Sequence, residues 1–188
     1  MKREIKVTFV FVILFGLSYF SAIAQNPDKL DYKAKVLEGG KGYKKLIGNV
    51  VFTQEKTIIY CDSAILFDKT NSMEAFGHVL IEDLEDSVTI TSERLNYQGN
   101  GRVAELRGNV VYKDDSVRLY TDNLDYDMVN KSAGYFGGGK IMDDVNTMTS
   151  KKGNYDTEGK MMVFTDSVKL ITPDYTLESD DLFYNILT

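Results

Sequence analysis

A repeat of about 29 residues runs through most of the chain and restricts the fold to tandem arrays in which neighbouring units pack on one another. Five copies of a short segment begin at positions 48, 77, 108, 137 and 166, so the steps are 29, 31, 29 and 29 residues. The copies are residues 48–52 (GNVVF), 77–81 (GHVLI), 108–112 (GNVVY), 137–141 (GGGKI) and 166–170 (DSVKL).

A second segment recurs about half a period after each copy of the first. Its copies are residues 62–66 (DSAIL), 93–97 (ERLNY), 122–126 (DNLDY), 151–155 (KKGNY) and 180–184 (DDLFY). Two segments that keep the same order in every period form one repeating unit. The pairs therefore predict about five tandem units between residues 46 and 184.

Both segments alternate apolar and polar residues, a pattern that predicts strands with one buried face. In the first copy, for example, Leu46, Val50 and Phe52 share one side of an extended strand. Short polar segments such as residues 68–71 (DKTN) and 98–101 (QGNG) supply turns between the strands. After the first 24 residues, no stretch keeps the spacing of an amphipathic helix, so the predicted fold class is all-β.

At the first residue of the second segment, the alternation of apolar and polar residues shifts by one position. This residue is acidic in four of the five copies. In the first copy this residue is Asp62, with Ile59 three residues before it and Ala64 two residues after it. A flat strand places two residues that are five apart on opposite faces, so one extra residue must restore the register. We therefore predict a bulge or bend at this position of every repeat.

Stacked strands with one apolar face predict two facing sheets around an elongated interior, as in a sandwich or a solenoid. The first and last strands of such an array lack a neighbour, so we expect an open sheet edge at each end. The positions that we expect to line the interior are Val50, Phe52, Ile59, Val79, Ile81, Ile90, Val110, Tyr112, Leu119, Ile141, Met148, Val168 and Leu170.

The first 24 residues have the pattern of an export leader. Lys2, Arg3 and Lys6 precede an apolar run over residues 7–20, and residues 22–24 (AIA) match a small-x-small cleavage site. The run approaches the length that a membrane-spanning helix needs, so an uncleaved anchor is the alternative. The expected organisation is a signal peptide or anchor at 1–24, a leading segment with the first edge strand at 25–45, and the repeats at 46–188.

The composition argues against several classes of function. The net charge is −6, whereas a nucleic-acid-binding surface must be basic. The single cysteine, Cys61, and the single histidine, His78, allow neither an intrachain disulfide nor a Cys/His zinc site. An enzyme such as a polysaccharide-cleaving β-solenoid would need charged residues clustered on one face. We expect no catalytic residue, no metal and no cofactor.

Several polar residues could carry chemistry but have a structural interpretation. An acidic ladder at the bends could bind divalent cations, but Asp favours turns and Lys151 interrupts the ladder. Residues 83–86 (DLED) lack the glycine and spacing of a calcium loop, so we interpret them as a solvated hairpin tip. Residues 137–139 (GGG) indicate a bulge or a close backbone approach. The ladder consists of Asp62, Glu93, Asp122 and Asp180.

Three other features have similar interpretations. His78 stands where other copies have Asn, which predicts an outward position at a turn. Cys61 precedes the bend in its strand and is expected to be a buried or half-buried free thiol. The tyrosines at 97, 126, 155 and 184 would stack within the sheet or line a groove for lipid or sugar.

Together these segments resemble the OstA-like family, the periplasmic lipopolysaccharide-transport proteins of the LptA type, with the LptC type as a membrane-anchored relative. The resemblance rests on the order and spacing of the GNVV-aromatic copies, the Asp-x-Leu-x-Tyr copies and three further segments, and it covers roughly residues 35–185. The further segments are residues 60–64 (YCDSA), 75–79 (AFGHV) and 135–141 (YFGGGKI).

The resemblance implies an elongated open β-jelly-roll whose apolar interior holds the acyl chains of lipid A. It also implies a periplasmic location and no catalysis. The implied partners are lipopolysaccharide, further transport components of the inner and outer membranes, and other copies of the chain, reached end to end through open edge strands. An interior filled by its own side chains has the same alternation. A structural β-repeat scaffold that assembles through its edges without lipid is therefore the alternative.

Overall fold

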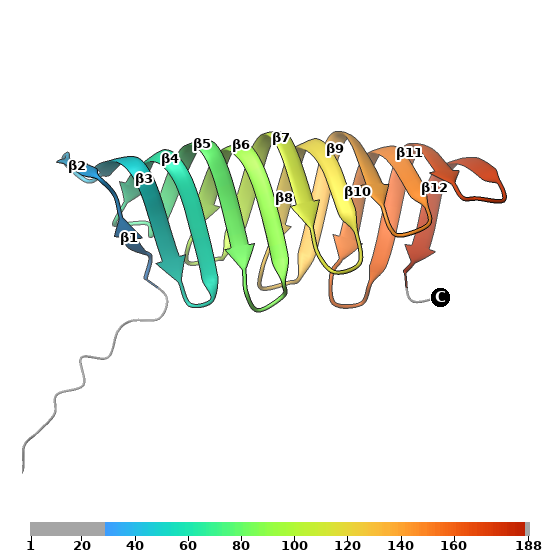
Figure 1. Cartoon of the computed structure of the whole chain (residues 1–188), viewed down its shortest axis with the longest axis horizontal. Helices are drawn as coiled ribbons and strands as arrows, with labels where there is room; N and C mark the ends of the chain where they lie inside the picture. Colours follow the sequence, from blue (N-terminus) through green and yellow to red (C-terminus); the bar gives the residue numbers. More distant parts are fainter. Residues whose placement is uncertain (1–28, 187–188) are drawn as a thin grey trace, which may run out of the picture.

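The computed structural model describes residues 29–186, so the predicted leader lies outside the described residues. Twelve strands follow one another along this part of the chain (Figure 1). They are β1 (Asp31–Lys33), β2 (Val36–Gly39), β3 (Lys44–Gln54), β4 (Thr57–Phe67), β5 (Ser72–Asp83), β6 (Val88–Gln98), β7 (Val103–Lys113), β8 (Arg118–Asp127), β9 (Ser132–Met142), β10 (Thr147–Asp156), β11 (Met161–Ile171) and β12 (Thr176–Asn185). Residues 29–186 hold no helix that could cross a membrane.

All twelve strands belong to one antiparallel sheet in which each strand from β3 onward pairs with the next. The two short strands share β3: β1 pairs with its residues 51–53 and β2 with its residues 44–47. One edge of the sheet is therefore formed by β1 and β2 and the other by β12, and the molecule is elongated across the strands (Figure 1). The predicted all-β array of two-strand repeats is confirmed.

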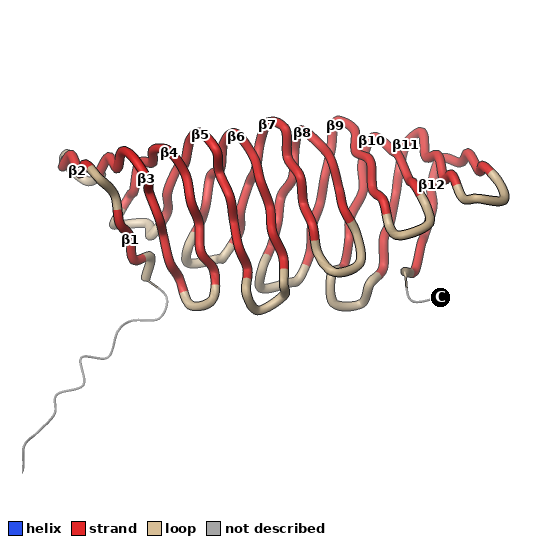
Figure 2. Tube along the Cα trace, viewed as in Figure 1, coloured by secondary structure: helices blue, strands red, loops and turns tan. Residues whose placement is uncertain are grey.

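The sheet is folded along a line that crosses the middle of its long strands, so that two halves face each other (Figure 2). Most of the turns lie on the side opposite the bend (Figure 2). The two facing sheets expected from the sequence are the halves of this single sheet, because the long strands continue through the bend. The eight turns that join β3 to β11 form two rows at the ends of the halves: a first rim at 55–56, 84–87, 114–117 and 143–146, and a second rim at 68–71, 99–102, 128–131 and 157–160.

At the bend two residues of the first segment lie opposite the first residue of the second segment, so the predicted bend is confirmed and the extra residue belongs to the first segment. Ile47 pairs with Ser63 and Val50 with Cys61, so residues 48–49 face Asp62 alone. A bulge of this kind bends a strand and increases its twist. Equivalent bulges place residues 77–78 against 93, 108–109 against 122, 137–138 against 151, and 166–167 against 180.

The backbone at the bend explains why glycine recurs in the first segment. Gly48 and Asn49 both have positive φ, at 79° and 50°, and Gly77 and His78 repeat this geometry. Glycine and, to a lesser degree, asparagine tolerate this left-handed region. A Cβ at Gly77 would also collide with the carboxylate of Asp62. Gly137 and Gly138 have positive φ too and lie together opposite Lys151, so of the two interpretations of the GGG segment the bulge is confirmed.

Candidate functional site

The interior between the two halves is apolar along the whole sheet. The thirteen residues expected to line it are all buried, with exposed fractions between 0 and 4%. They belong to one contiguous hydrophobic cluster that runs from Leu30 to Leu170. Burial of a side chain of this size stabilises a fold by about 1.5–3 kcal/mol, so this cluster is the main source of stability.

Large side chains fill the interior in this structure. Tyr97, Tyr112, Tyr126 and Tyr155 are each at most 2% exposed. The ring of Tyr112 packs edge-on against Tyr126 and Tyr155, with ring centroids 5.9 and 6.2 Å apart. The larger cavities lie outside, such as one of about 490 Å³ lined by Phe76 and other outer-face residues. A lipid chain could therefore enter only if the halves moved apart or the side chains repacked.

The interior opens on the side of the turns, where the two rims approach each other and form a mouth. Side chains of the second rim and of the strands that lead to it bond to the first rim, or to the strand residue just before it, at four successive repeats. We call each group of contacts a clasp. The clasps are formed by Tyr97 and Arg102 with Gln54 and Glu55; by Tyr126 and Lys131 with Asp86; by Tyr155 and Lys160 with Asp114; and by Tyr184 with Asp143 and Asn146.

The third clasp shows how one carboxylate joins several elements. Oδ2 of Asp114 accepts hydrogen bonds from the Tyr155 hydroxyl at 2.8 Å and from Lys160 Nζ at 3.3 Å. Its Oδ1 accepts the backbone N–H groups of Ser116 and Val117 at 2.7 and 2.8 Å. Burial acts to raise the pKa of Asp114, but these donors outweigh it, so the pKa lies below its usual value. Asp114 is therefore ionised at neutral pH and fixes its turn as well as the mouth.

The other clasps repeat this arrangement with different side chains. In the first, Tyr97 donates to Gln54 Oε1 at 2.9 Å and Arg102 donates to Glu55 Oε2 at 2.9 Å. Burial raises the pKa of Tyr97 to about 12, so its hydroxyl keeps its proton at neutral pH. In the second, Lys131 pairs with Asp86, and Tyr126 lies 3.5 Å from the same carboxylate.

The fourth clasp differs because its described contacts include no cation. Tyr184 donates to Asp143 Oδ2 at 2.9 Å, and Asn146 Nδ2 donates to the Tyr184 oxygen at 2.8 Å. Burial acts to raise the pKa of Asp143, but its hydrogen-bond donors hold it below the usual value, so the Tyr184 hydrogen bond is charge-assisted through its acceptor alone. The described contacts of this clasp therefore hold the rims together with fewer charged groups than those of the first three.

Asp83 is a buried carboxylate next to the mouth. Its exposed fraction is 1%, its Oδ1 accepts the N–H of Glu85 at 3.1 Å, and its Oδ2 has no hydrogen-bond partner among the described residues. Burial raises the pKa of Asp83. The interpretation of residues 83–86 as a solvated tip is therefore wrong for Asp83, which the pleat turns inward, and for Asp86, which belongs to the second clasp.

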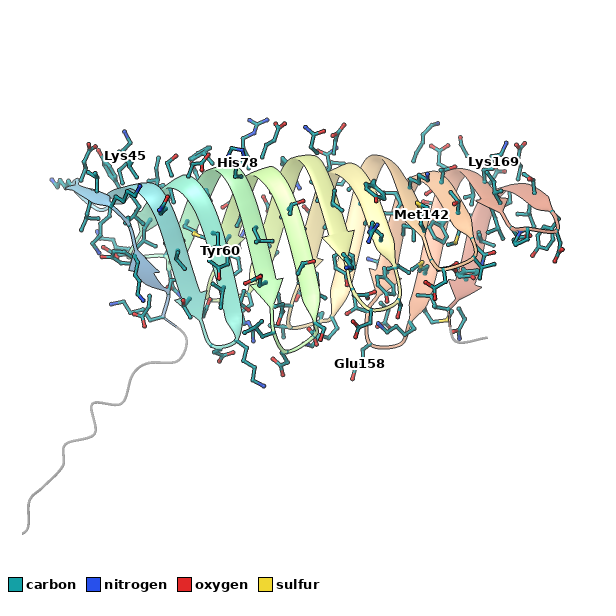
Figure 3. The ribbon with its side chains drawn as sticks, in the orientation of Figure 1. Lys45, Tyr60, His78, Met142, Glu158 and Lys169 are labelled. Atoms are coloured by element: carbon teal, nitrogen blue, oxygen red, sulfur yellow. The ribbon has the colours of Figure 1, made fainter. Side chains whose placement is uncertain are left out.

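The acidic residues at the bend make local contacts. Asp62 lies 2.7 Å from Nδ1 of His78, Glu93 accepts from Asn109 Nδ2 at 2.6 Å, and Lys151 pairs with Asp166 at 2.9 Å. Figure 3 shows His78 on the bend side of the molecule, pointing outward as predicted, and Glu158 on the opposite side with the turns. Within residues 29–186 no three His, Cys, Asp or Glu side chains gather as a metal site.

Cys61 is buried and forms no disulfide. Burial raises its pKa to about 11, so the protonated thiol dominates at neutral pH. Because the thiolate is the reactive form, this residue is a packing group and not a poised nucleophile.

The sequence interpretation found the interior but missed the clasps. The tyrosines at 97, 126, 155 and 184 were expected to stack in the sheet or line a groove, whereas their hydroxyl groups also bond across the mouth. The basic residues Arg102, Lys131 and Lys160 recur at steps of 29 residues, and this periodicity was a usable signal. Their carboxylate partners Glu55, Asp86 and Asp114 are spaced 31 and 28 residues apart, and this irregular spacing hid the pairing.

Comparison with known proteins gives the chain a family. The family model described as OstA-like protein matches residues 24–180. No curated protein matches. Among solved structures, LptH of Pseudomonas aeruginosa, described as the LptA-homologous periplasmic component of the lipopolysaccharide transport device, is 14% identical, with 77% of this chain and 96% of that chain covered and a TM-score of 0.35. Such a score is too low for inference, so the assignment rests on the family model. The chain belongs to the OstA-like protein family.

Proposed function

We propose that this protein binds lipopolysaccharide in the periplasm and passes it between the inner and outer membranes. The acyl chains of lipid A would lie between the two halves of the sheet, against residues such as Phe52, Ile81 and Tyr112. One observation carries the proposal: this chain, which belongs to the OstA-like family, has an apolar interior that is continuous along the whole sheet. Each CH₂ group of a ligand buried there would contribute about 0.8 kcal/mol, so several chains would give tight binding.

Partners would join at the two ends of the sheet. Leu37 on β2 pairs with Leu46, and Leu177 on β12 pairs with Leu170, so both face the interior side. Both are exposed, at 54 and 37%, because no further strand covers them. An added strand would bury these residues and pair with the free backbone groups of the edge. Such partners would be membrane-bound transport components or further copies of the chain. The proposed role requires no catalytic residue.

Site-specific photo-cross-linking tests the proposal. A photoreactive residue at Tyr112, inside the sheet and 0% exposed, is compared with one at Tyr120, on the outer face and 38% exposed. Phe52 inside and Phe76 outside form a second matched pair. In Gram-negative cells we expect lipopolysaccharide adducts at Tyr112 and Phe52 and none at Tyr120 and Phe76. Adducts at the outer positions alone would contradict an interior lipid site.

A structural scaffold is the second candidate, and the filled interior favours it. In this case the halves would stay closed and the chain would assemble end to end without lipid. Analytical ultracentrifugation distinguishes the two candidates when it is combined with lipid analysis. Concentration-dependent oligomers that carry no lipid would support the scaffold, whereas lipid in the monomer would support the carrier.

A further inference from the structure

In the three ion pairs that cross the mouth, all the cations lie on one rim and all the carboxylates on the other. The three cations Arg102, Lys131 and Lys160 all belong to the second rim. Their partners are all carboxylates of the first rim: Glu55, Asp86 and Asp114. The cationic side chains are 18, 23 and 25% exposed, so each lies largely inside the protein. The mouth is therefore a basic row facing an acidic row.

A small cavity lies in the mouth between the second and third clasps. Its volume is about 140 Å³, and Lys131 and Lys160 line it together with Asp86 and Asp114. Val88, a residue of the hydrophobic cluster, also borders the cavity, as does Glu158. Charged groups of the rim and apolar groups of the interior thus meet in one space, which suits an amphiphile with an anionic head.

Opening the mouth would separate the two rows. The carboxylates would move with the first rim, and the cations would stay on the second rim without their partners. A largely buried cation that loses its partner is costly, so the open form favours any ligand that supplies a replacement anion. Phosphate groups fit this need because they accept several charge-assisted hydrogen bonds from Arg and Lys.

We propose that Arg102, Lys131 and Lys160 form a phosphate-binding row that holds the headgroup phosphates of a phosphorylated lipid once the clasps open. This inference rests on the proposed function and adds the residues that would recognise the polar end of the ligand. Successive members of the row are two strands apart, which corresponds to about 10 Å in a sheet. A headgroup with more than one phosphate could therefore contact two neighbouring cations while its acyl chains occupy the interior.

Two sets of substitutions distinguish cations that bind phosphate from cations that only hold the mouth closed. The first set, Arg102→Gln, Lys131→Gln and Lys160→Gln, removes the cations. The second set, Glu55→Gln, Asp86→Asn and Asp114→Asn, removes the carboxylates. Both sets break the same three ion pairs. The control removes the pair of Lys169 and Glu178, which lie 3.0 Å apart on the outer face, through Lys169→Gln and Glu178→Gln. If a triple variant does not fold, the single changes Lys131→Gln and Asp86→Asn take the place of the two sets.

The measurement is equilibrium binding of lipid A and of the same lipid after its phosphates are removed. We expect the wild type to bind the phosphorylated form at least about tenfold more tightly, the gain of one or two charge-assisted contacts. The cation variant should lose this preference. The carboxylate variant should bind both lipids more tightly and keep the preference. The outer-face control should behave as the wild type.

Three results would overturn the inference, and a fourth would overturn the proposed function. If the cation and carboxylate variants both bind more tightly and both keep the preference, the cations only close the mouth. If the wild type binds the two lipids equally, phosphate is not recognised. If inorganic phosphate alone binds with the same dependence on the cations, the row serves free phosphate and not a lipid. Failure of every form to bind either lipid would instead contradict the proposed function.

Discussion

The hydroxyl group of Tyr155 donates a hydrogen bond of 2.8 Å to Asp114 across the mouth of the folded sheet. The two residues are 41 positions apart and belong to opposite halves. Equivalent contacts recur in the neighbouring repeats, so closure of the interior depends on polar clasps as well as on apolar packing.

Tyr155→Phe should lower the free energy of unfolding by about 1–2 kcal/mol, because it deletes a buried hydrogen bond to an ionised carboxylate. Urea denaturation followed by circular dichroism measures the change. Tyr120→Phe, on the exposed outer face, is the matched control and should have little effect. Equal losses for the two variants would show that the clasp contributes nothing specific.

Asp114→Asn should destabilise the protein at pH 7, and the loss should shrink in acid. The pKa of Asp114 is lowered in the folded state because its backbone and side-chain donors outweigh burial. Its contribution is therefore present above the unfolded value of about 3.9 and is lost as the pH falls through the folded pKa. Urea midpoints at neutral pH and near pH 3 test this. A difference from the wild type that stayed constant would contradict the assignment.

Asp83→Asn should stabilise the protein at neutral pH, the opposite of the effect of Asp114→Asn. Burial raises the folded pKa of Asp83, so its contribution is present below the unfolded value and is lost as the pH rises through the folded pKa. At neutral pH the substitution removes a buried charge with an unpaired oxygen, and it should raise the urea midpoint. The gain should disappear near pH 4. Asp144→Asn in an exposed turn serves as the control.

Gly108→Ala should cost about 1 kcal/mol or more, because φ at this position is +80° and an L-residue is strained there. The new Cβ would also lie 2.7 Å from Oε2 of Glu93. Gly39→Ala is the control, since that Cβ would meet no heavy atom within 4 Å and φ lies outside the strained region. Thermal unfolding compares the two variants. Equal melting temperatures would show that the bulge tolerates a side chain.

Leu37→Lys and Leu177→Lys should each weaken the proposed end-to-end association of the chain. Both residues expose the end of the apolar interior, and a lysine there would have to be desolvated in a joined sheet. Sedimentation velocity over a range of concentrations measures the effect. Lys45→Gln, on a side chain that projects outward, should leave association unchanged (Figure 3). Association that survives both leucine substitutions would place the contact elsewhere.

The interior and the bends could be predicted from the sequence because both depend on local rules. Alternation placed Phe52 and Ile81 inside, and the change of phase between Ile59 and Ala64 located the bend at Asp62. In each case the physical cause lies within a few residues of the same strand. Because the sequence repeats, the same assignments apply to the equivalent residues of each copy.

The clasps could not be predicted in the same way, because they join residues that are distant in the sequence. Tyr155 meets Asp114 only because the sheet folds back on itself, and the sequence alone did not distinguish one folded sheet from two facing sheets. Asp83 was missed for a related reason. A hairpin tip rich in acidic residues normally faces water, but here the pleat of β5 directs the side chain of Asp83 inward.

Native mass spectrometry of the chain purified from Gram-negative cells tests whether the folded sheet carries lipid. The wild type and the Glu55→Gln, Asp86→Asn, Asp114→Asn variant are compared, because opened clasps should ease uptake of lipid. We expect a bound mass equal to that of lipopolysaccharide or lipid A on both proteins, with higher occupancy on the variant. If a folded wild type and a folded variant both carry no lipid, the interior is a structural core and the carrier function is contradicted.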